Sequence, residues 1–176
     1  MTSLRRGILA LLCLLALGAC LSACSKQKPV TSAGRELTPR GASALLIDVP
    51  AEYNIEARQG ADFDVFYIQR AKTEHGDPPK DGMGIYVGHA PNFSPPKDAR
   101  TMSGTIAGRK VTWYAWEDDT AERTLLRAQT LLPGLFSGAK DQAGGGAGLQ
   151  VHIFLWAPGE KRLGILKDAA ETLRLK

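Results

Sequence analysis

The sequence predicts an α+β fold: a mainly antiparallel sheet with a C-terminal helix packed on one face. Short apolar runs separated by turn residues, from residue 44 onward, indicate strands joined by short links. Residues 149–156 (LQVHIFLW) are almost continuously apolar, as in a central strand. Residues 162–173 carry apolar side chains at three- and four-residue steps, as in an amphipathic helix.

Residues 1–23 have the layout of a secretory signal peptide. Arg5 and Arg6 are the only charged residues among the first 24, and residues 7–19 are apolar. A basic start followed by an apolar stretch is typical of exported proteins. The stretch from 7 to 23 is shorter than the roughly 20 residues of a stable spanning helix. An uncleaved signal anchor is the alternative.

Two short sequences at the end of this leader resemble the lipobox of bacterial lipoproteins, in which Leu and two small residues precede a cysteine. They are residues 17–20 (LGAC) and 21–24 (LSAC). We prefer Cys24 because the chain turns polar directly after it, whereas Cys20 would leave Leu21 near the mature start. Cys20 remains the alternative.

The lipobox resemblance implies that Cys24 is acylated and becomes the first residue of the mature chain. Its acyl chains would anchor the protein in a membrane. Ser25 follows the cysteine rather than Asp, which by resemblance to the sorting rule of enteric bacteria favours the outer over the inner membrane. We therefore expect a lipid-anchored protein of the cell envelope that faces the periplasm.

The sequence divides the mature chain into a tether and one domain. Residues 24–40 begin with the cysteine that the lipobox resemblance implies is acylated, and Pro29, Gly34 and Pro39 among the polar residues after it predict a flexible tether. An irregular arm that packs on the domain is the alternative. Residues 41–176 are expected to form a single α+β domain.

The elements of this domain follow from local patterns. Strands are expected at residues 44–49, 62–70, 83–87, 105–117 (entered through a tight turn near Gly108), 122–132 and 149–156. Residues 122–132 also fit a helix, but a hairpin with the preceding strand favours a strand. Residues 90–100 contain three prolines and cannot be a central strand.

An apolar strand, a Pro-Gly turn and a closing helix loosely resemble the PsbP-like group of accessory proteins. The resemblance rests on Val49-Pro50, on residues 149–156 and on residues 162–173. It implies accessory or assembly work rather than catalysis.

Charge and cysteine content narrow the function classes. The chain has 22 Lys+Arg and 18 Asp+Glu, and without Arg5 and Arg6 the excess is 20 − 18 = 2 positive charges. This near balance argues against a nucleic-acid partner. All three cysteines, Cys13, Cys20 and Cys24, lie in the leader region, so the domain offers no thiolate for catalysis or metal binding.

Few residues are candidates for chemistry. His89 follows the 83–87 strand and could be a general base, although a turn histidine is the simpler interpretation. Asp62 and Asp64 share a strand face and could bind a cation, although a solvated Asp64 is the simpler interpretation. No nucleophile elbow, phosphate-binding loop or zinc motif occurs, so we expect no metal and no cofactor.

The aromatic residues suggest a binding surface instead. Trp113 and Trp116 lie three residues apart on a predicted strand and therefore point to opposite faces. Both in the core is the simpler interpretation, and a core residue paired with an exposed recognition surface is the alternative. Trp113, Trp116 and His89 are the candidate binding residues.

These observations favour a noncovalent binding or assembly module that holds an unidentified envelope protein or ligand near the membrane. A small envelope hydrolase using carboxylates or His89 is one alternative. An inhibitor or immunity-type lipoprotein, with residues 90–100 as a protruding loop, is another.

Overall fold

The computed structural model describes residues 32–70, 80–119, 124–136 and 148–176. The predicted leader, Cys20 and Cys24 lie outside these residues, as do residues 25–31 of the predicted tether. Among the described residues, no helix is both long and apolar enough to cross a membrane.

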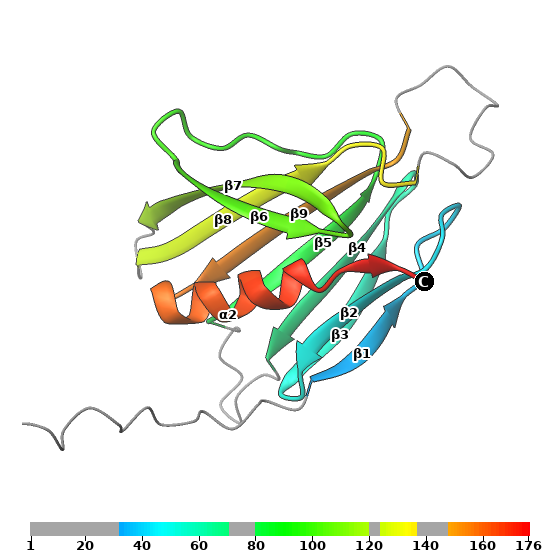
Figure 1. Ribbon diagram of the computed structural model, residues 1–176, viewed down its shortest axis with the longest axis horizontal. Helices are drawn as coiled ribbons and strands as arrows, with labels where there is room; N and C mark the ends of the chain where they lie inside the picture. Colours follow the sequence, from blue (N-terminus) through cyan, green and yellow to red (C-terminus); the bar gives the residue numbers. More distant parts are fainter. Residues whose placement is uncertain (1–31, 71–79, 120–123, 137–147) are drawn as a thin grey trace, which may run out of the picture. The chain divides into compact units, whose positions relative to one another are not determined.

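The described chain forms two antiparallel sheets and one helix (Figure 1). The large sheet has seven strands in the order β3 (Tyr53–Gln59), β4 (Phe63–Arg70), β5 (Gly82–Gly88), β9 (Gln150–Ala157), β8 (Thr124–Leu132), β7 (Arg109–Asp119) and β6 (Arg100–Ile106). The small sheet has the order β1 (Ser32–Leu37), β2 (Leu45–Pro50) and β10 (Arg174–Leu175). The helix α2 (Glu160–Glu171) follows β9. This confirms a mainly antiparallel α+β fold with a C-terminal helix against a sheet.

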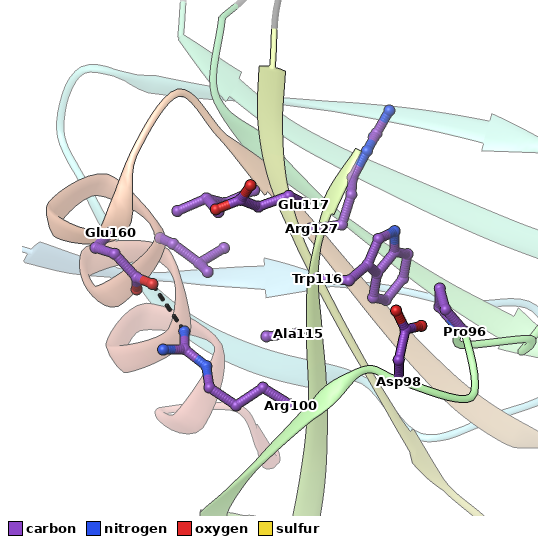
Figure 2. Close-up of a pocket in the computed structure, with 10 residues that line it drawn as sticks. Pro96, Asp98, Arg100, Ala115, Trp116, Glu117, Arg127 and Glu160 are labelled. Carbon is purple, nitrogen blue, oxygen red and sulfur yellow. Dashed lines mark hydrogen bonds and ion pairs between the residues drawn. The ribbon is translucent and has the colours of Figure 1, made fainter. Parts of the chain in front are cut away.

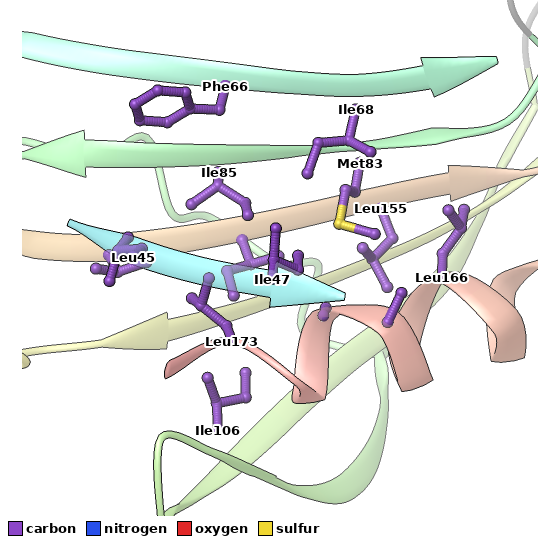
Figure 3. Close-up of a cluster of buried hydrophobic side chains, with 14 of the residues drawn as sticks. Leu45, Ile47, Phe66, Ile68, Met83, Ile85, Ile106, Leu155, Leu166 and Leu173 are labelled. Atoms are coloured by element: carbon purple, nitrogen blue, oxygen red, sulfur yellow. The ribbon is translucent and has the colours of Figure 1, made fainter. Parts of the chain in front are cut away.

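The core lies between the large sheet and a layer made by α2 and β2. Leu45 and Ile47 of β2, together with Leu166 of α2, are fully buried against strands of the large sheet such as β5 (Figure 3). Burying one such side chain contributes roughly 1.5–3 kcal/mol. We call the sheet face beneath this layer the inner face and the opposite face the outer face.

Several predicted elements are confirmed. Residues 122–132 contain the strand β8, as preferred over a helix, and Ala128, Thr130 and Leu132 are buried along it. The proline-rich segment 90–100 lies outside the sheet except for Arg100, which begins the edge strand β6. The tight turn near Gly108 joins β6 to β7.

The turn between β6 and β7 has two residues, Ala107 and Gly108, with φ of 50° and 74°. Positive φ at both positions is the requirement of a type I′ turn, whose twist suits a two-residue hairpin. The Ala107 backbone N–H also donates to the Leu173 carbonyl oxygen at 3.0 Å. The hairpin is thereby tied to the end of α2.

The predicted boundary at residue 41 is wrong, because β1 lies within the predicted tether. β1 pairs with the whole of β2, and its Leu37 is 1% exposed. Arg40 donates its backbone N–H to Asp64 Oδ2 at 2.6 Å and its Nε–H to Oδ1 at 3.1 Å. Leu37 and Arg40 therefore belong to the folded domain.

The interpretation of Asp64 as a solvated residue is also wrong. Its side chain is 5% exposed and accepts both hydrogen bonds from Arg40. Asp62 is exposed, so the two carboxylates do not form a shared site. A buried carboxylate needs such a partner, which explains why Arg40 packs against β4.

Candidate functional site

Strand alternation determines which residues of the large sheet reach the outer face. On β5, Met83, Ile85 and Val87 are buried on the inner side, so Gly82, Gly84, Tyr86 and Gly88 point outward. The register places Trp156 beside Gly82 and Phe154 beside Gly84. Residues of α2 and the small sheet pack on the other side, as Figure 1 shows.

The outer face carries two groups of contacting aromatic rings, the Phe63–Tyr86 pair and a chain of six, which together we call the aromatic band. Its members are Phe63, Tyr67, Tyr86, Phe93, Tyr114, His152, Phe154 and Trp156, taken from β4, β5, β7, β9 and the 89–99 segment. Neighbouring ring centroids lie 5.4 Å apart for Phe63 and Tyr86 and 6.2 Å apart for Tyr67 and Phe154. Such distances are typical of favourable aromatic pairs.

Two rings lie flat on the sheet because β5 has glycines beneath them. A Cβ added to Gly82 would lie 2.6 Å from Trp156 Cζ2, and one added to Gly84 would collide with the Phe154 ring. The two rings are tilted by only 23°, with centroids 6.2 Å apart. Because Gly82 and Gly84 are two residues apart on β5, the Trp156 and Phe154 rings above them lie side by side on the same face. Both side chains are half-buried on the outer face.

His152 is the one titratable member of the band that is buried. It is 4% exposed, its ring lies 5.5 Å from those of both Phe93 and Phe154, and its Nε2 is 3.2 Å from Gln129 Oε1. Burial lowers the pKa of His152 to about 4. At neutral pH the imidazole is therefore uncharged, and its Nε2–H can donate to Gln129.

The structure separates the three predicted binding residues. Trp113 is 0% exposed on the inner face, where its indole N–H donates to Glu171 Oε1 at 3.0 Å. It is a core residue, and its assignment to the binding surface is wrong. Trp116 lies on the outer side of β7 and is half-buried, so the prediction of opposite faces is confirmed.

His89 is exposed just beyond the end of β5, and its carbonyl oxygen accepts a hydrogen bond from Gln150 Nε2 at 3.4 Å. The register places Trp116 in the same row as Gly82, at the opposite end of β5. His89 and Trp116 therefore do not form one site.

Trp116 instead lines a groove of about 410 Å³ at the end of β7 (Figure 2). Its lining consists of Pro96, Asp98, Arg100, Ala115, Trp116, Glu117, Leu126, Arg127, Glu160 and Leu163. Arg100 pairs with Glu160 at 2.8 Å, and Arg127 pairs with Asp118 at 2.9 Å. The groove therefore combines apolar walls with charged rims.

A polar cluster formed by Tyr53, Arg70 and Asp81 joins the start of β3 to the start of β5. Tyr53 is fully buried and donates its hydroxyl to Asp81 Oδ2 at 2.5 Å. Burial, and then the hydrogen bond to Asp81, raises the pKa of Tyr53 to about 12. Arg70 Nε lies 3.7 Å from the same carboxylate oxygen. Tyr53 thus keeps its proton and pins β3 to β5.

Among the described residues, no group of three or more His, Cys, Asp or Glu side chains is arranged to hold a metal ion. The aromatic band was missed at the level of sequence. The alternation of Gly82 and Gly84 with buried residues, and the spacing of Phe154 and Trp156 by two, were the signals that could have indicated it.

The comparisons with known proteins place the chain in no family. No family model matches it, and neither does any curated protein. Among solved structures, a protein of Bacteroides thetaiotaomicron VPI-5482 is similar over 75% of this chain, with 14% sequence identity and a TM-score of 0.42. The matching region covers 45% of that protein, so this chain spans less than half of its length.

Proposed function

We propose that this chain is a lipid-anchored envelope protein whose domain acts as a noncovalent binding or assembly module. The aromatic band carries the proposal. It is a set of neighbouring rings on a sheet face opposite α2, where Phe154 and Trp156 lie half-buried over Gly84 and Gly82. Large, rigid aromatic side chains supply contact area at low cost in conformational entropy, which makes them frequent anchors of binding surfaces.

The lipobox-like leader supports the location in this proposal. Acylation at Cys24 would leave only residues 25–31 between the lipid and β1, so the domain would stay near the bilayer. Tethering raises the local concentration of a binding module, and weak binding then suffices. The loose resemblance to PsbP-like accessory proteins supports the same type of role.

Lipidation is tested by two matched variants. We expect Cys20→Ala to leave an acylated amino-terminal peptide beginning at Cys24 and Cys24→Ala to abolish it, because only the thiol of the first mature residue takes the lipid. Mass spectrometry of that peptide, together with membrane fractionation, makes the measurement. An uncut and unacylated amino terminus in the wild type would contradict the proposed anchor.

Binding through the aromatic band is tested with Tyr67→Ser. Tyr67 is half-buried and lies at the β4 side of the band, beneath the Arg58 guanidinium at 5.0 Å. We expect Tyr67→Ser to weaken capture of a component from the protein's own envelope extract about tenfold or more, since removal of an anchor ring costs more than about 1.4 kcal/mol.

The matched control for that experiment is Lys161→Ser on the exposed side of α2, which should bind as the wild type does. Both variants are compared at equal folded fractions, determined from thermal unfolding. Equal capture by Tyr67→Ser and the wild type would contradict the proposal. Chemical turnover of the captured component would favour the hydrolase alternative.

A further inference from the structure

We propose that the groove at the end of β7 binds an extended polypeptide segment that carries a lysine or arginine side chain, by adding it as a strand to β7. This goes beyond the proposed function, because a module that binds through the aromatic band needs no strand edge. The proposal rests on the register of β7, on the shape of the groove and on its charges.

β7 is longer than its neighbour β6. The pairing of β6 with β7 ends at Arg100 and Ala115, whereas the pairing of β8 with β7 continues to Thr124 and Asp119. Residues 116–119 are therefore paired on one side only, as far as the described strands show. At about 3.3 Å per residue, this leaves about 13 Å of strand edge for an added segment.

The chain itself turns away from this edge. Just before β6, the Ala99 N–H donates to the Pro96 carbonyl oxygen at 3.1 Å, which closes a turn. Pro95 and Pro96 have no N–H to offer a neighbouring strand. The groove lies between this turn and the start of α2, along the unpaired part of β7 (Figure 2).

The groove has two sides with different chemistry. In Figure 2, Trp116, Pro96 and Asp98 lie on one side of β7, and the Arg100–Glu160 pair lies on the other. On the second side, the lining includes three apolar side chains and two carboxylates, namely Ala115, Leu126, Leu163, Glu117 and Glu160. A long side chain lying along this side can cover the apolar residues with its stem and reach the exposed carboxylates of Glu117 and Glu160 with its charged end. Lysine and arginine have this form.

The charges of the groove favour a cation. Arg100 is engaged by Glu160, and Arg127 is engaged by Asp118. The lining of the groove carries the carboxylates of Asp98, Glu117 and Glu160 against these two guanidinium groups, and Asp118 and Asp119 extend the acidic run at the end of β7. Complementary charge attracts a basic segment and repels an acidic one.

The same charges argue against a second copy of this chain at this edge. Edge-to-edge pairing of two β7 strands would bring the acidic residues 117–119 of both copies together. Like charges opposite each other across a strand pair are destabilising. A basic extended segment is therefore the favoured occupant.

The test uses the full acylated protein in detergent micelles and a defined heptapeptide, acetyl-Thr-Val-Thr-Lys-Thr-Val-Thr-amide. Its companions replace the central lysine by norleucine, which keeps the stem without the charge, or by glutamate. We expect the lysine peptide to bind about tenfold more tightly than the norleucine peptide, with an affinity that falls as salt is added. The glutamate peptide should not bind. Titration calorimetry gives the affinities.

Variants locate the bound peptide. Glu117→Gln should weaken the lysine peptide about fivefold and leave the norleucine peptide unchanged, whereas Glu52→Gln, at an exposed acid near β3, should change neither. Two further peptides carry N-methyl groups on alternate peptide bonds, at odd positions in one and at even positions in the other. One of the two should not bind, because an added strand donates every second N–H group to its neighbour. Tyr67→Ser should bind the lysine peptide normally, which separates this test from that of the aromatic band.

Equal affinities for the lysine and norleucine peptides would overturn the proposal, and so would unchanged binding to Glu117→Gln. Lack of binding of all peptides up to millimolar concentration would also overturn it. Sedimentation experiments provide a further test. If the protein forms a dimer and Glu117→Lys strengthens that dimer, the proposal is overturned, because the edge would then bind a second copy of the chain.

Discussion

Each buried polar side chain discussed above has a specific partner from a distant part of the chain. Asp64 is held by Arg40, Asp81 by Tyr53, and the Trp113 indole by Glu171. An unpaired buried polar group costs roughly 1–3 kcal/mol, so these pairs fix how segments meet as much as they stabilise the fold. His152 avoids the cost of a buried charge in another way, because burial lowers its pKa and keeps the imidazole neutral.

The depressed pKa of His152 makes stability depend on pH. Below the usual histidine pKa of 6.5, the unfolded chain binds a proton that folded His152 does not bind until about pH 4. The free energy of unfolding should therefore fall as pH is lowered from about 6.5 to 4, by up to about 3 kcal/mol from this residue.

Urea unfolding at several pH values measures this effect. Between pH 6.5 and pH 5, the free energy of unfolding of His152→Gln should fall less steeply than that of the wild type. This comparison of slopes does not depend on how stable the variant is at neutral pH. The ring C–H resonance of His152 should also stay unchanged until the pH approaches 4. Equal slopes for the two proteins in this range would contradict a neutral, buried imidazole.

At the level of elements, glycines have opposite roles in the β6–β7 turn and in α2. Gly108 has φ of 74° and Gly164 lies within α2, and a Cβ at either position would meet nothing within 4 Å. Backbone conformation alone therefore decides the effect of adding a methyl group at these two positions.

We expect Gly108→Ala to lower the free energy of unfolding by about 1 kcal/mol, because a non-glycine residue is strained at positive φ. Gly164→Ala should raise it by about 1 kcal/mol, because alanine favours the helix. Chemical denaturation of the two variants measures both changes. A change of the same sign in both would show that contacts, rather than backbone conformation, dominate.

The elements that could be predicted are those whose pattern is local. β4 and β7 are runs of apolar and aromatic residues whose neighbours point to opposite faces, and α2 repeats Leu163, Leu166 and Ala170 on one side. β1 and β3 were missed because each is an edge strand in which many side chains are exposed, so that pairing with a neighbour defines them.

The candidate site was predicted only in part for a related reason. A period of two places Trp113 and Trp116 on opposite faces, but it does not say which face α2 covers. That choice depends on Glu171 reaching the Trp113 indole from a different element. The flat rings over β5 depend on the register between β5 and β9, which no single segment contains.

For the described molecule as a whole, the small sheet makes residues 32–40 part of the fold. β1 covers one side of β2, and Arg40 supports the turn before β4 through the Gly60 and Phe63 carbonyl oxygens. A domain that began at residue 41 would expose β2 along this side and leave Asp64 without Arg40. Loss of Leu37 from the core alone removes about 2 kcal/mol.

A chain shortened to residues 41–176 should therefore unfold at a lower urea concentration than one that covers residues 31–176, by an amount equivalent to about 3 kcal/mol or more. Arg40→Ala in the longer chain should account for roughly 1–3 kcal/mol of this loss. Equal unfolding midpoints for the shorter and longer chains would mean that β1 is dispensable.

The central strand of the small sheet has consequences for the order of events during biogenesis. β2 lies between β1 and β10, and the ion pair between Glu36 and Lys176 joins residues 140 positions apart. A ribosome must therefore synthesise β10 before the sheet can close, and earlier fragments present an incomplete layer over the core.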